Sequence, residues 1–363
     1  MNVSLLPPKS TDWEKALEAA CDVVDILGPS IAEIAGIKFH RPLNPTVGPS
    51  LVIEYGLGPI AEFFTTIEEL IDQGRPWQAI RGTPQAKHLA LAWIGYDAIT
   101  IEDQNAGRRR WHLQTIDMGK LPTAATEDYR LGKAEYLVGL SNRARTVFFR
   151  GYHGYDVRAL QFGKSSWGNA IWGDSSGIRI NGGDVKWSHG RTHALSGKVN
   201  SSLYTSLGIN FTNGDQLTWN TPIITWNTPG LTWNGVTDAD AVRAWFVLRQ
   251  SIHFALRDQA GDTIGYTRCF DLAEITGATG YTDGKRYVRA AAVVPFEAAP
   301  GAVVASVSIV MGGAAATGVK PAKRWYAPDE LVFGAGEQEL LSKPLSIDLM
   351  KTCRELITVV MEI

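Results

Sequence analysis

Cysteine is scarce in this chain. The three residues, Cys21, Cys269 and Cys353, lie far apart and show neither a CxxC pair nor another metal-ligand spacing. A disulfide framework needs several cysteines at short, regular intervals, so the sequence argues against one. We therefore expect reduced thiols in a protein made in the cytoplasm.

An excess of charge is also missing, because 35 basic residues stand against 37 acidic ones. Such a balance provides no general attraction to nucleic acid or to an anionic membrane. The first residues lack a basic segment followed by a long apolar one, so we expect no secretory signal. The uncharged stretch 301–319 alternates Val303, Ala305, Val307 and Ile309 before a Gly-Gly break, which predicts a strand and a loop and no membrane span.

Motifs for catalysis and for cofactors are missing as well. No GxxxxGK[ST] or GxGxxG motif follows a predicted strand. The serines of GDSSG at 173–177 lack the GxSxG pattern of a nucleophile elbow and have ordinary turn composition. We predict a protein that is not an enzyme and has no cofactor.

Two histidines raise the question of a zinc site. His189 and His193 have a spacing that would place both rings on one face of a helix. Gly190 and the surrounding glycines and serines argue against a helix there, and no third ligand stands at a suitable spacing. We predict exposed loop histidines and no metal. The basic run GRRRW at 107–111 is expected to be a hairpin tip or a contact with a neighbouring subunit, in preference to a phosphate site.

The N-terminal region, in contrast, contains clear signals for a helix. Thr11 and Glu14 form a T-x-x-E capping box, and Gly28-Pro29 is the predicted stop. Between them, apolar residues recur at spacings of four and three, as in a narrow coiled-coil seam. This seam consists of Trp13, Leu17, Ala20, Val24 and Leu27. Two heptads leave two interpretations open: packing with helices of other chains, or docking on the chain's own domain.

Two further helices and a strand are predicted next. One helix runs from Pro59 to Asp72 and ends at QGRP, and the other has Thr83 as N-cap, Pro84 as first residue and a stop at Gly95. The apolar face of the first is formed by Ile60, Phe63, Phe64, Ile67, Leu70 and Ile71. That of the second is formed by Ala86, Leu89, Ala90, Trp93 and Ile94. Alternation of Ile99 and Ile101 with polar residues then predicts a strand.

Four segments of the first 160 residues together resemble the phage tail protein I family, whose members are baseplate wedge components of contractile-tailed phages. They are LLPP at 5–8, the helix headed by Trp13, RGTPQAKHLALAWIGYDAITIED at 81–103 and FFRGYHGYDVR at 148–158. The sequence departs from the family between Leu43 and Trp77, where PSLVIEYGLGPIAEFF replaces a Trp-rich stretch of the kind LPWLAW.

The resemblance implies a structural virion protein without catalytic residues or cofactor. It implies a wedge subunit, present in several copies, that assembles with larger J-type baseplate subunits around the central spike hub and contacts fibre and sheath proteins. The chain would be made in the host cytoplasm and end in the tail baseplate. The seam residues are our predicted interface with the partner subunits.

A threefold repeat, TWNTPIITWNTPGLTWNG, occupies residues 218–235. Pro222 and Pro229 exclude a coiled coil, so each unit is predicted to be a very short strand and a bend. Trp219, Trp226 and Trp233 are interpreted as packing or interface aromatics. The alternative is a glycan-binding module at the tail tip, because indole rings with nearby Asn residues suit a sugar. A cell-wall hydrolase is a third option, for which we find no paired acid and base.

Strand signals dominate from about residue 146. The dipeptides Asn181-Gly182, Asn213-Gly214 and Asp283-Gly284 predict tight turns. From 244 onward, one face carries Phe246, Leu248, Ile252, Phe254 and Leu256, and the other carries Arg249, Ser251, His253 and Arg257. A hairpin over 258–270 and strands at 306–311 and 355–363 follow.

These signals predict an α+β fold in three parts. They are a helical tail-protein-I-like domain (1–145), a Trp/Gly-rich β segment (146–235) and a sandwich-like antiparallel β domain (236–363).

Overall fold

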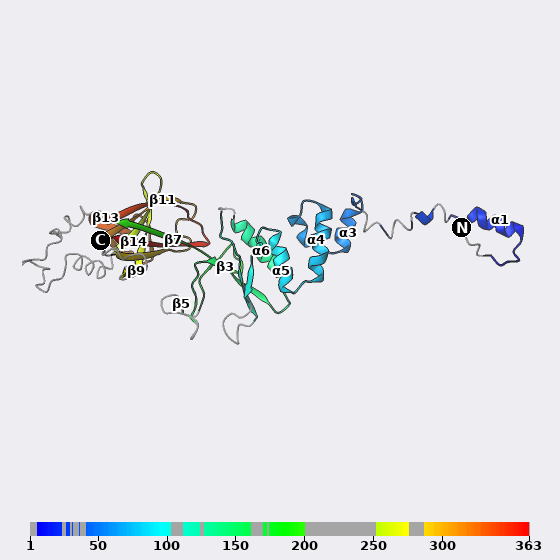
Figure 1. Cartoon of the computed structure of the whole chain (residues 1–363), viewed down its shortest axis with the longest axis horizontal. Helices are drawn as coiled ribbons and strands as arrows, with labels where there is room; N and C mark the ends of the chain where they lie inside the picture. Colours follow the sequence, from blue (N-terminus) through cyan, green and yellow to red (C-terminus); the bar gives the residue numbers. More distant parts are fainter. Residues whose placement is uncertain are drawn as a thin grey trace, which may run out of the picture. The chain divides into compact units, whose positions relative to one another are not determined.

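A computed structural model describes residues 6–23, 27–29, 31, 36, 41–102, 112–123, 127–160, 170–172, 174–199, 252–275 and 287–362 (Figure 1). The chain forms two compact units, Met1–Gly95 and Tyr96–Ile363. Helices precede a strand-rich region, so the predicted α+β class is confirmed. The predicted boundary at 145–146 lies inside the second unit, and that at 235–236 falls outside the described residues.

Helix α1 (Asp12–Cys21) begins with the predicted capping box. The Thr11 amide donates to Glu14 Oε2 at 2.7 Å, and the Glu14 amide donates to Thr11 Oγ1 at 3.4 Å. The predicted continuation to a stop at Gly28-Pro29 is wrong, because α1 ends before Asp22 and residues 27–29 are themselves helical. Asp22 has extended backbone, and aspartate is unfavourable inside a helix because its short side chain competes for backbone hydrogen bonds.

The middle of the first unit contains α3 (Gly48–Glu54), η1 (Gly58–Phe63), α4 (Ile67–Ala79) and α5 (Pro84–Ala92). The predicted helix Pro59–Asp72 is wrong in its bounds. Thr66 accepts a hydrogen bond from the Glu69 amide at 3.2 Å and starts a new helix, α4, which continues through Gly74 and Pro76. A Cβ at Gly74 would lie 2.8 Å from Leu57 Cδ2, so glycine permits the close packing of this helix.

Helix α5 has the predicted N-cap, first residue and C-terminal glycine. Thr83 Oγ1 accepts from the Ala86 amide at 3.3 Å, Pro84 is the first helical residue, and Gly95 follows with a φ of +84°. Ala86 and Ala90 are fully buried, as the predicted apolar face requires.

Twelve described strands of the second unit belong to one sheet, and β4 (Arg158–Ala159) and β5 (Ala170–Ile171) form a separate pair. The main path runs through β1 (Thr100–Glu102), β2 (Leu113–Asp117), β3 (Val147–Gly154), β7 (Lys186–Lys198), β14 (Cys353–Glu362), β10 (Tyr287–Val294), β9 (Thr263–Ile275), β8 (Ile252–Arg257), β11 (Val303–Ala315) and β13 (Leu331–Asp348). Strand β6 (Ile178–Arg179) pairs with β7, and β12 (Trp325–Tyr326) pairs with β9. The strand predicted after Gly95 is β1.

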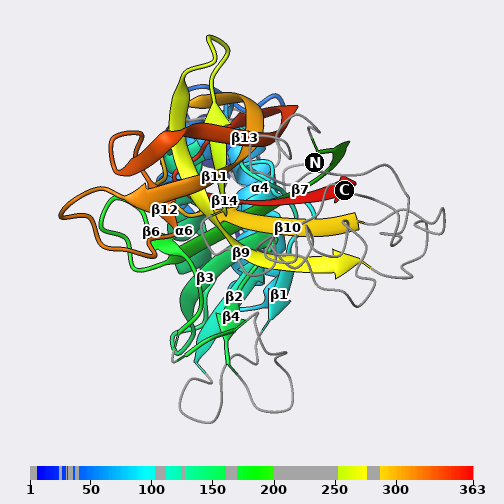
Figure 2. The same cartoon turned by 90° about the vertical axis from the view of Figure 1, so that its left-hand side faces the viewer.

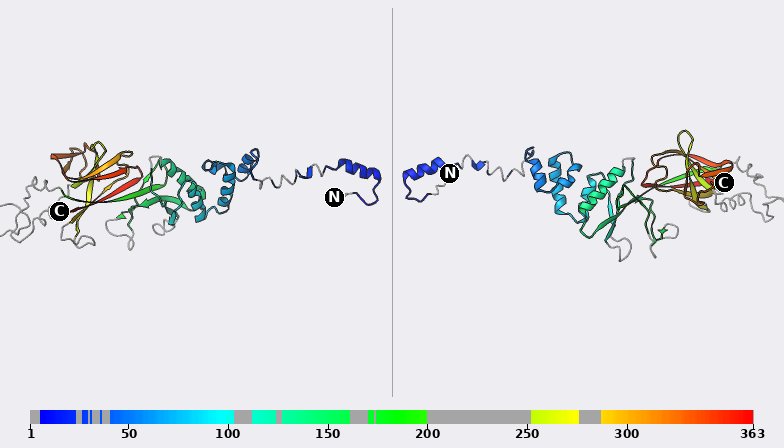
Figure 3. Two further views of the ribbon diagram at one scale, coloured as in Figure 1. Left: turned by 45° about the horizontal axis from the view of Figure 1, so that its top comes forward. Right: turned by 180° about the vertical axis from the view of Figure 1, so that it is seen from behind.

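The sheet changes from parallel to antiparallel pairing along this path. The pairs β2–β3, β3–β7 and β7–β14 are parallel, and α6 (Glu127–Ser141) connects β2 to β3 and packs against β3 (Figure 1, Figure 3). All described pairings among β8 to β14 are antiparallel, as predicted for the C-terminal part. Strand β7, which precedes residue 236, joins this part through β14.

Strands β7 to β14 enclose the main core (Figure 2). The first half of β9 pairs with β8 and the second half with β10, so this strand passes from one layer to the other. Ile252, Phe254 and Leu256 are buried in the core, which confirms the predicted apolar face of β8. His253 lies on the opposite face, as predicted, and this face is also covered, because His253 is buried and its ring packs edge-on against that of Tyr326.

The other predictions for the second unit concern tight turns and the uncharged stretch 301–319. Asn181 and Gly182 have φ values of 50° and 76° and form the expected turn between β6 and β7. The stretch 301–319 contains β11, as predicted. Among the described helices, none has the length and apolar character needed to cross a membrane. The dipeptides Asn213-Gly214 and Asp283-Gly284 lie outside the described residues.

Candidate functional site

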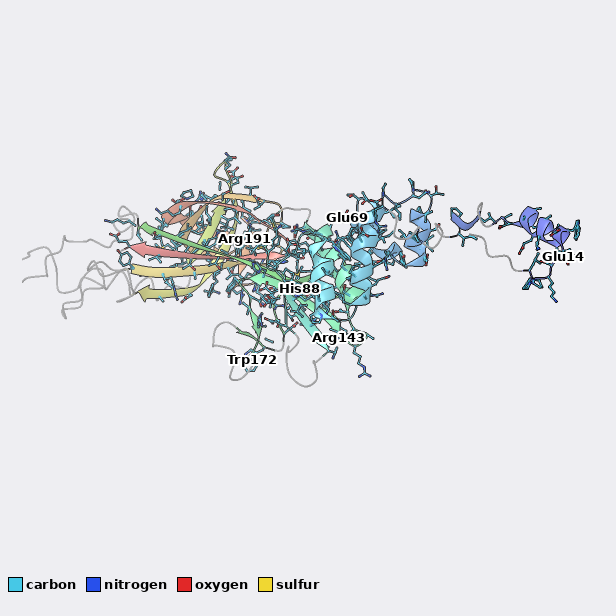
Figure 4. All side chains as sticks on the ribbon, turned by 45° about the vertical axis from the view of Figure 1, so that its right-hand side comes forward. Glu14, Glu69, His88, Arg143, Trp172 and Arg191 are labelled. Carbon is cyan, nitrogen blue, oxygen red and sulfur yellow. The ribbon has the colours of Figure 1, made fainter. Side chains whose placement is uncertain are left out.

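The exposed apolar face of α1 is the first candidate. The side chains of Trp13 and Leu17, one turn apart, are 72% and 49% exposed, and Ala20 is exposed beside them. No residue of α1 is buried (Figure 4, where Glu14 marks this helix). Of the other predicted seam residues, Leu27 is also exposed but lies beyond the break at Asp22, and Val24 falls outside the described residues. The structure therefore brings three of the five together on one helix.

The polar side of α1 is acidic. One lysine, Lys15, stands against Asp12, Glu14 and Glu18, which gives a formal charge of 1 − 3 = −2 over this helix. Acidic residues in the first turn stabilise the helix through its dipole. A polypeptide that covered Trp13 and Leu17 would gain from basic residues beside its apolar face.

A buried polar cluster in the second unit is the second candidate. We call it the arginine-serine cluster, and its members are Arg150, Asp156, Ser176, Ser188 and Arg354. The register of β3, β7 and β14 places Arg150, Ser188 and Arg354 on one face of the sheet. Asp156 and Ser176 come from the segments after β3 and before β6.

Ser176 is the centre of the arginine-serine cluster. Its hydroxyl accepts from Arg150 Nη2 at 3.1 Å and from Arg354 Nη2 at 3.0 Å, and donates to Asp156 Oδ1 at 3.1 Å. Ser188 Oγ lies 3.0 Å from the Ser176 hydroxyl and donates to Asp156 at the same distance. Arg150 binds Asp156 through both terminal nitrogens. Ser176 thus links two guanidinium groups to one carboxylate.

Burial changes the acidity of this cluster. Burial acts to raise the pKa of Asp156, but the hydrogen bonds from Arg150, Ser188 and Ser176 hold the pKa below its ordinary value. Burial lowers the pKa of Arg354, although this group remains a strong base. Asp156 is therefore ionised at neutral pH, next to two buried cations.

A second ionic cluster joins β7 to β14. The carboxylate of Glu355, 1% exposed, accepts from Arg191 Nε at 2.9 Å and Nη2 at 2.6 Å and lies 2.8 Å from His193 Nε2 (Figure 4 labels Arg191). Burial alone would raise the pKa of Glu355, but His193 and Arg191 lower it. These contacts fix the register of the parallel pair.

The two histidines that we predicted in an exposed loop lie in strand β7. His189 is fully buried against Trp187, and neither ring nitrogen has a hydrogen-bond partner. Burial, and then the neighbouring His153, lower the pKa of His189 to about 4. Four residues of strand separate His189 from His193 by roughly 13 Å, too far for one metal ion. No group of three or more potential metal ligands occurs among the described residues.

Two other features singled out in the sequence lie outside the described residues. They are the tryptophans of the threefold repeat, Trp219, Trp226 and Trp233, and the basic run 107–111. The choice between packing aromatics and a glycan shelf therefore stays a prediction. Sequence reasoning missed Arg150 and Arg354, although an arginine inside an otherwise apolar strand is a usable signal of a buried ion.

No protein-family model matches the chain, and no curated protein matches it significantly. The similarity to the phage tail protein I family thus stays an interpretation of the sequence segments quoted above.

Proposed function

We propose that this chain is a structural subunit of the baseplate wedge of a contractile phage tail. In this proposal, helix α1 packs with helices of partner baseplate proteins, and the β-rich unit holds neighbouring tail components. The observation that carries the proposal is the capped helix α1 with its exposed Trp13 and Leu17.

The energetics of α1 support a role in assembly. A helix of ten residues is marginal by itself in water, and most helical stability in proteins comes from packing an apolar face. A tryptophan buries about 150–250 Å² when it is covered, and tryptophan is enriched at the centres of protein interfaces. The acidic side of α1 favours a partner helix with basic residues beside its apolar face.

The continuous sheet suits a part that transmits force. Ten strands follow one hydrogen-bonded path that starts at β1, passes through β7 and β14 and ends at β13, and this path includes both the parallel and the antiparallel pairs. In a wedge, such a unit would move as a body and pass a change at the periphery of the baseplate to the sheath through subunit interfaces with two stable packings.

The test is co-expression with the tail proteins encoded by neighbouring genes, followed by affinity purification. The double variant Trp13→Asp/Leu17→Asp should lose co-purification of its partner, because two charges would enter the apolar interface. Ala19→Asp is the control, since it adds one negative charge on the other side of α1 and should retain the partner; the single variant Leu17→Asp, which adds the same one charge on the apolar side, should weaken co-purification. Unchanged complex formation by the double variant would refute the proposal.

A further inference from the structure

Strand β7 has an open edge over its second half. On one side, β3 pairs with β7 only as far as Gly190, whose carbonyl accepts from the Tyr155 amide at 2.9 Å. On the other side, β14 continues to pair with β7 as far as Lys198 (Figure 1). Beyond Gly190, therefore, one edge of β7 has no neighbouring strand among the residues that the structure describes.

The direction of the backbone groups shows which residues form this edge. The His189 amide donates to the Thr352 carbonyl at 3.1 Å, and the Val199 amide donates to a carbonyl of β14 at 3.0 Å, so odd-numbered residues direct their backbone groups toward β14. Because this direction alternates along a strand, even-numbered residues direct theirs to the open edge. Within the described part of the chain, the amides and carbonyls of these exposed residues have no hydrogen-bond partner; they are Thr192, Ala194, Ser196 and Lys198.

The two outer strands of the main path, in contrast, have protected edges. Strand β1 has only three residues, and β13 carries Lys343 and Pro344 and shifts its register against β11. Short length, lysine, proline and bulges are the features by which proteins prevent unwanted strand pairing. The open edge of β7 lacks them: its exposed side chains from Thr192 to Ser196 are small and uncharged, and its register with β14 is regular. Such an edge can accept another strand.

A second copy of this edge matches the first. In an antiparallel pair with a twofold axis at Leu195, Ala194 lies opposite Ser196 of the second copy, and Thr192 lies opposite its Lys198. Small side chains then meet, and no lysine faces a lysine. Leu195, which packs against the main core, meets its own counterpart on the inner face. Each of the four opposed pairs exchanges two backbone hydrogen bonds, about eight in total.

We propose that the chain forms a twofold-symmetric dimer in which the open edges of β7 pair antiparallel and join the sheets of two copies. The end of β3 supports this register, because β3 of the second copy stops beside its Gly190 and so lies beyond Lys198, where β7 has ended. This inference is independent of the role proposed for α1, since it depends on β7 and its neighbours alone.

The test is the mass of the full chain in solution, measured by sedimentation over a series of concentrations. The parent chain should be a dimer that dissociates on dilution. Ala194→Lys/Ser196→Lys places like charges opposite each other and should raise the dimer dissociation constant roughly tenfold or more. Ala194→Lys/Ser196→Glu is the matched control, because opposite charges then face each other and the dimer should persist. Trp13→Asp/Leu17→Asp should also leave the dimer intact, which separates this interface from that of α1.

Hydrogen exchange of the unmodified chain identifies the paired edge directly. The amides of Ala194 and Ser196 should exchange roughly tenfold faster in the dissociated chain than in the dimer, because they lose their partners. Those of His193 and Leu195, which point toward β14, should keep their rates. The proposal would be overturned by a chain that is monomeric at every concentration, by protection of Ala194 and Ser196 that does not depend on concentration, or by a dimer that tolerates Ala194→Lys/Ser196→Lys or is lost in Trp13→Asp/Leu17→Asp.

Discussion

Glu355 and Arg191 face each other directly across the parallel pair β7–β14, and the guanidinium holds the carboxylate through Nε and Nη2. The two residues are 164 positions apart in the sequence, so this contact closes a large part of the second unit. Arg191 also donates to the backbone oxygen of Asp348 at 2.5 Å, and His193 is the second residue that contacts the carboxylate. The β7–β14 junction is therefore held by a buried ionic cluster as well as by backbone pairing.

Removal of the charge of Glu355 should destabilise the chain strongly. Glu355→Gln leaves Arg191, whose side chain is 21% exposed, without its carboxylate partner, and because solvent reaches part of this guanidinium we expect the free energy of unfolding to fall by about 2–3 kcal/mol. Asp271→Asn, which breaks the exposed pair with Arg289, is the matched control and should cost less than about 1 kcal/mol. Urea unfolding followed by tryptophan fluorescence compares the two. Equal losses would contradict a special role of the buried cluster.

His189 should make the stability depend on pH. Its pKa is lowered from 6.5 to about 4, so between these values the unfolded chain binds a proton that the folded chain does not. Stability from this group is complete above pH 6.5 and is lost as the pH falls toward 4, on the order of 3 kcal/mol in total. The charged and titratable groups that act on His189 are His153, Asp117 and Arg130.

The variant His189→Phe isolates this effect, because phenylalanine retains a ring against Trp187 and has no proton to bind. Urea unfolding at pH 7, 6 and 5 should show a smaller loss of stability in the variant than in the parent chain. If both chains lose stability equally over this range, the protonation of His189 is not the cause.

Local signals in the sequence predict helix starts well. Thr11 and Thr83 were identified as caps because a cap depends on the side chain and the next three residues alone. Thr66 follows the same T-x-x-E pattern with Glu69, so its cap was available in the sequence. The apolar face predicted across Pro59 to Asp72 obscured it, because residues on both sides of the break contribute to one core.

The candidate site could not be derived in the same way. Strand β7 contains polar residues and glycines, and its assignment depends on pairing with β3 and β14, which no local pattern reveals. Ser176 and Arg354 are separated by 178 residues, so their contact is a consequence of that pairing. His189 is buried for the same reason.

Gly151 should tolerate no side chain. A Cβ at this position would overlap the ring of Trp187, which is fully buried and meets Phe148 edge-on. We expect Gly151→Ala to lower the free energy of unfolding by about 1–3 kcal/mol, since the indole has no room to move. Gly132→Ala in α6 is the control, because nothing lies within 4 Å of the added carbon and alanine favours a helix by about 1 kcal/mol. Destabilisation of both variants alike would contradict the steric explanation.

Cysteine labelling provides a test that connects stability with assembly. Cys21 is exposed and lies one turn after Leu17 on the same side of α1, whereas burial raises the pKa of Cys269 to about 11 and that of Cys353 to about 12. A maleimide at pH 8 should therefore modify one thiol quickly and two only as the chain unfolds, because the thiolate is the reactive form. Cys21→Ser should remove the fast phase.

The same reaction reports on the partner of α1. If partner helices cover Trp13 and Leu17 in the assembled wedge, Cys21 should react at least tenfold more slowly in the purified complex than in the isolated chain, while Cys269 and Cys353 keep their rates. Mass spectrometry of the labelled peptides distinguishes the three sites. Because Cys21 belongs to the same exposed side of the helix, an unchanged rate in a complex that still contains both proteins would show that the partner binds elsewhere on the chain.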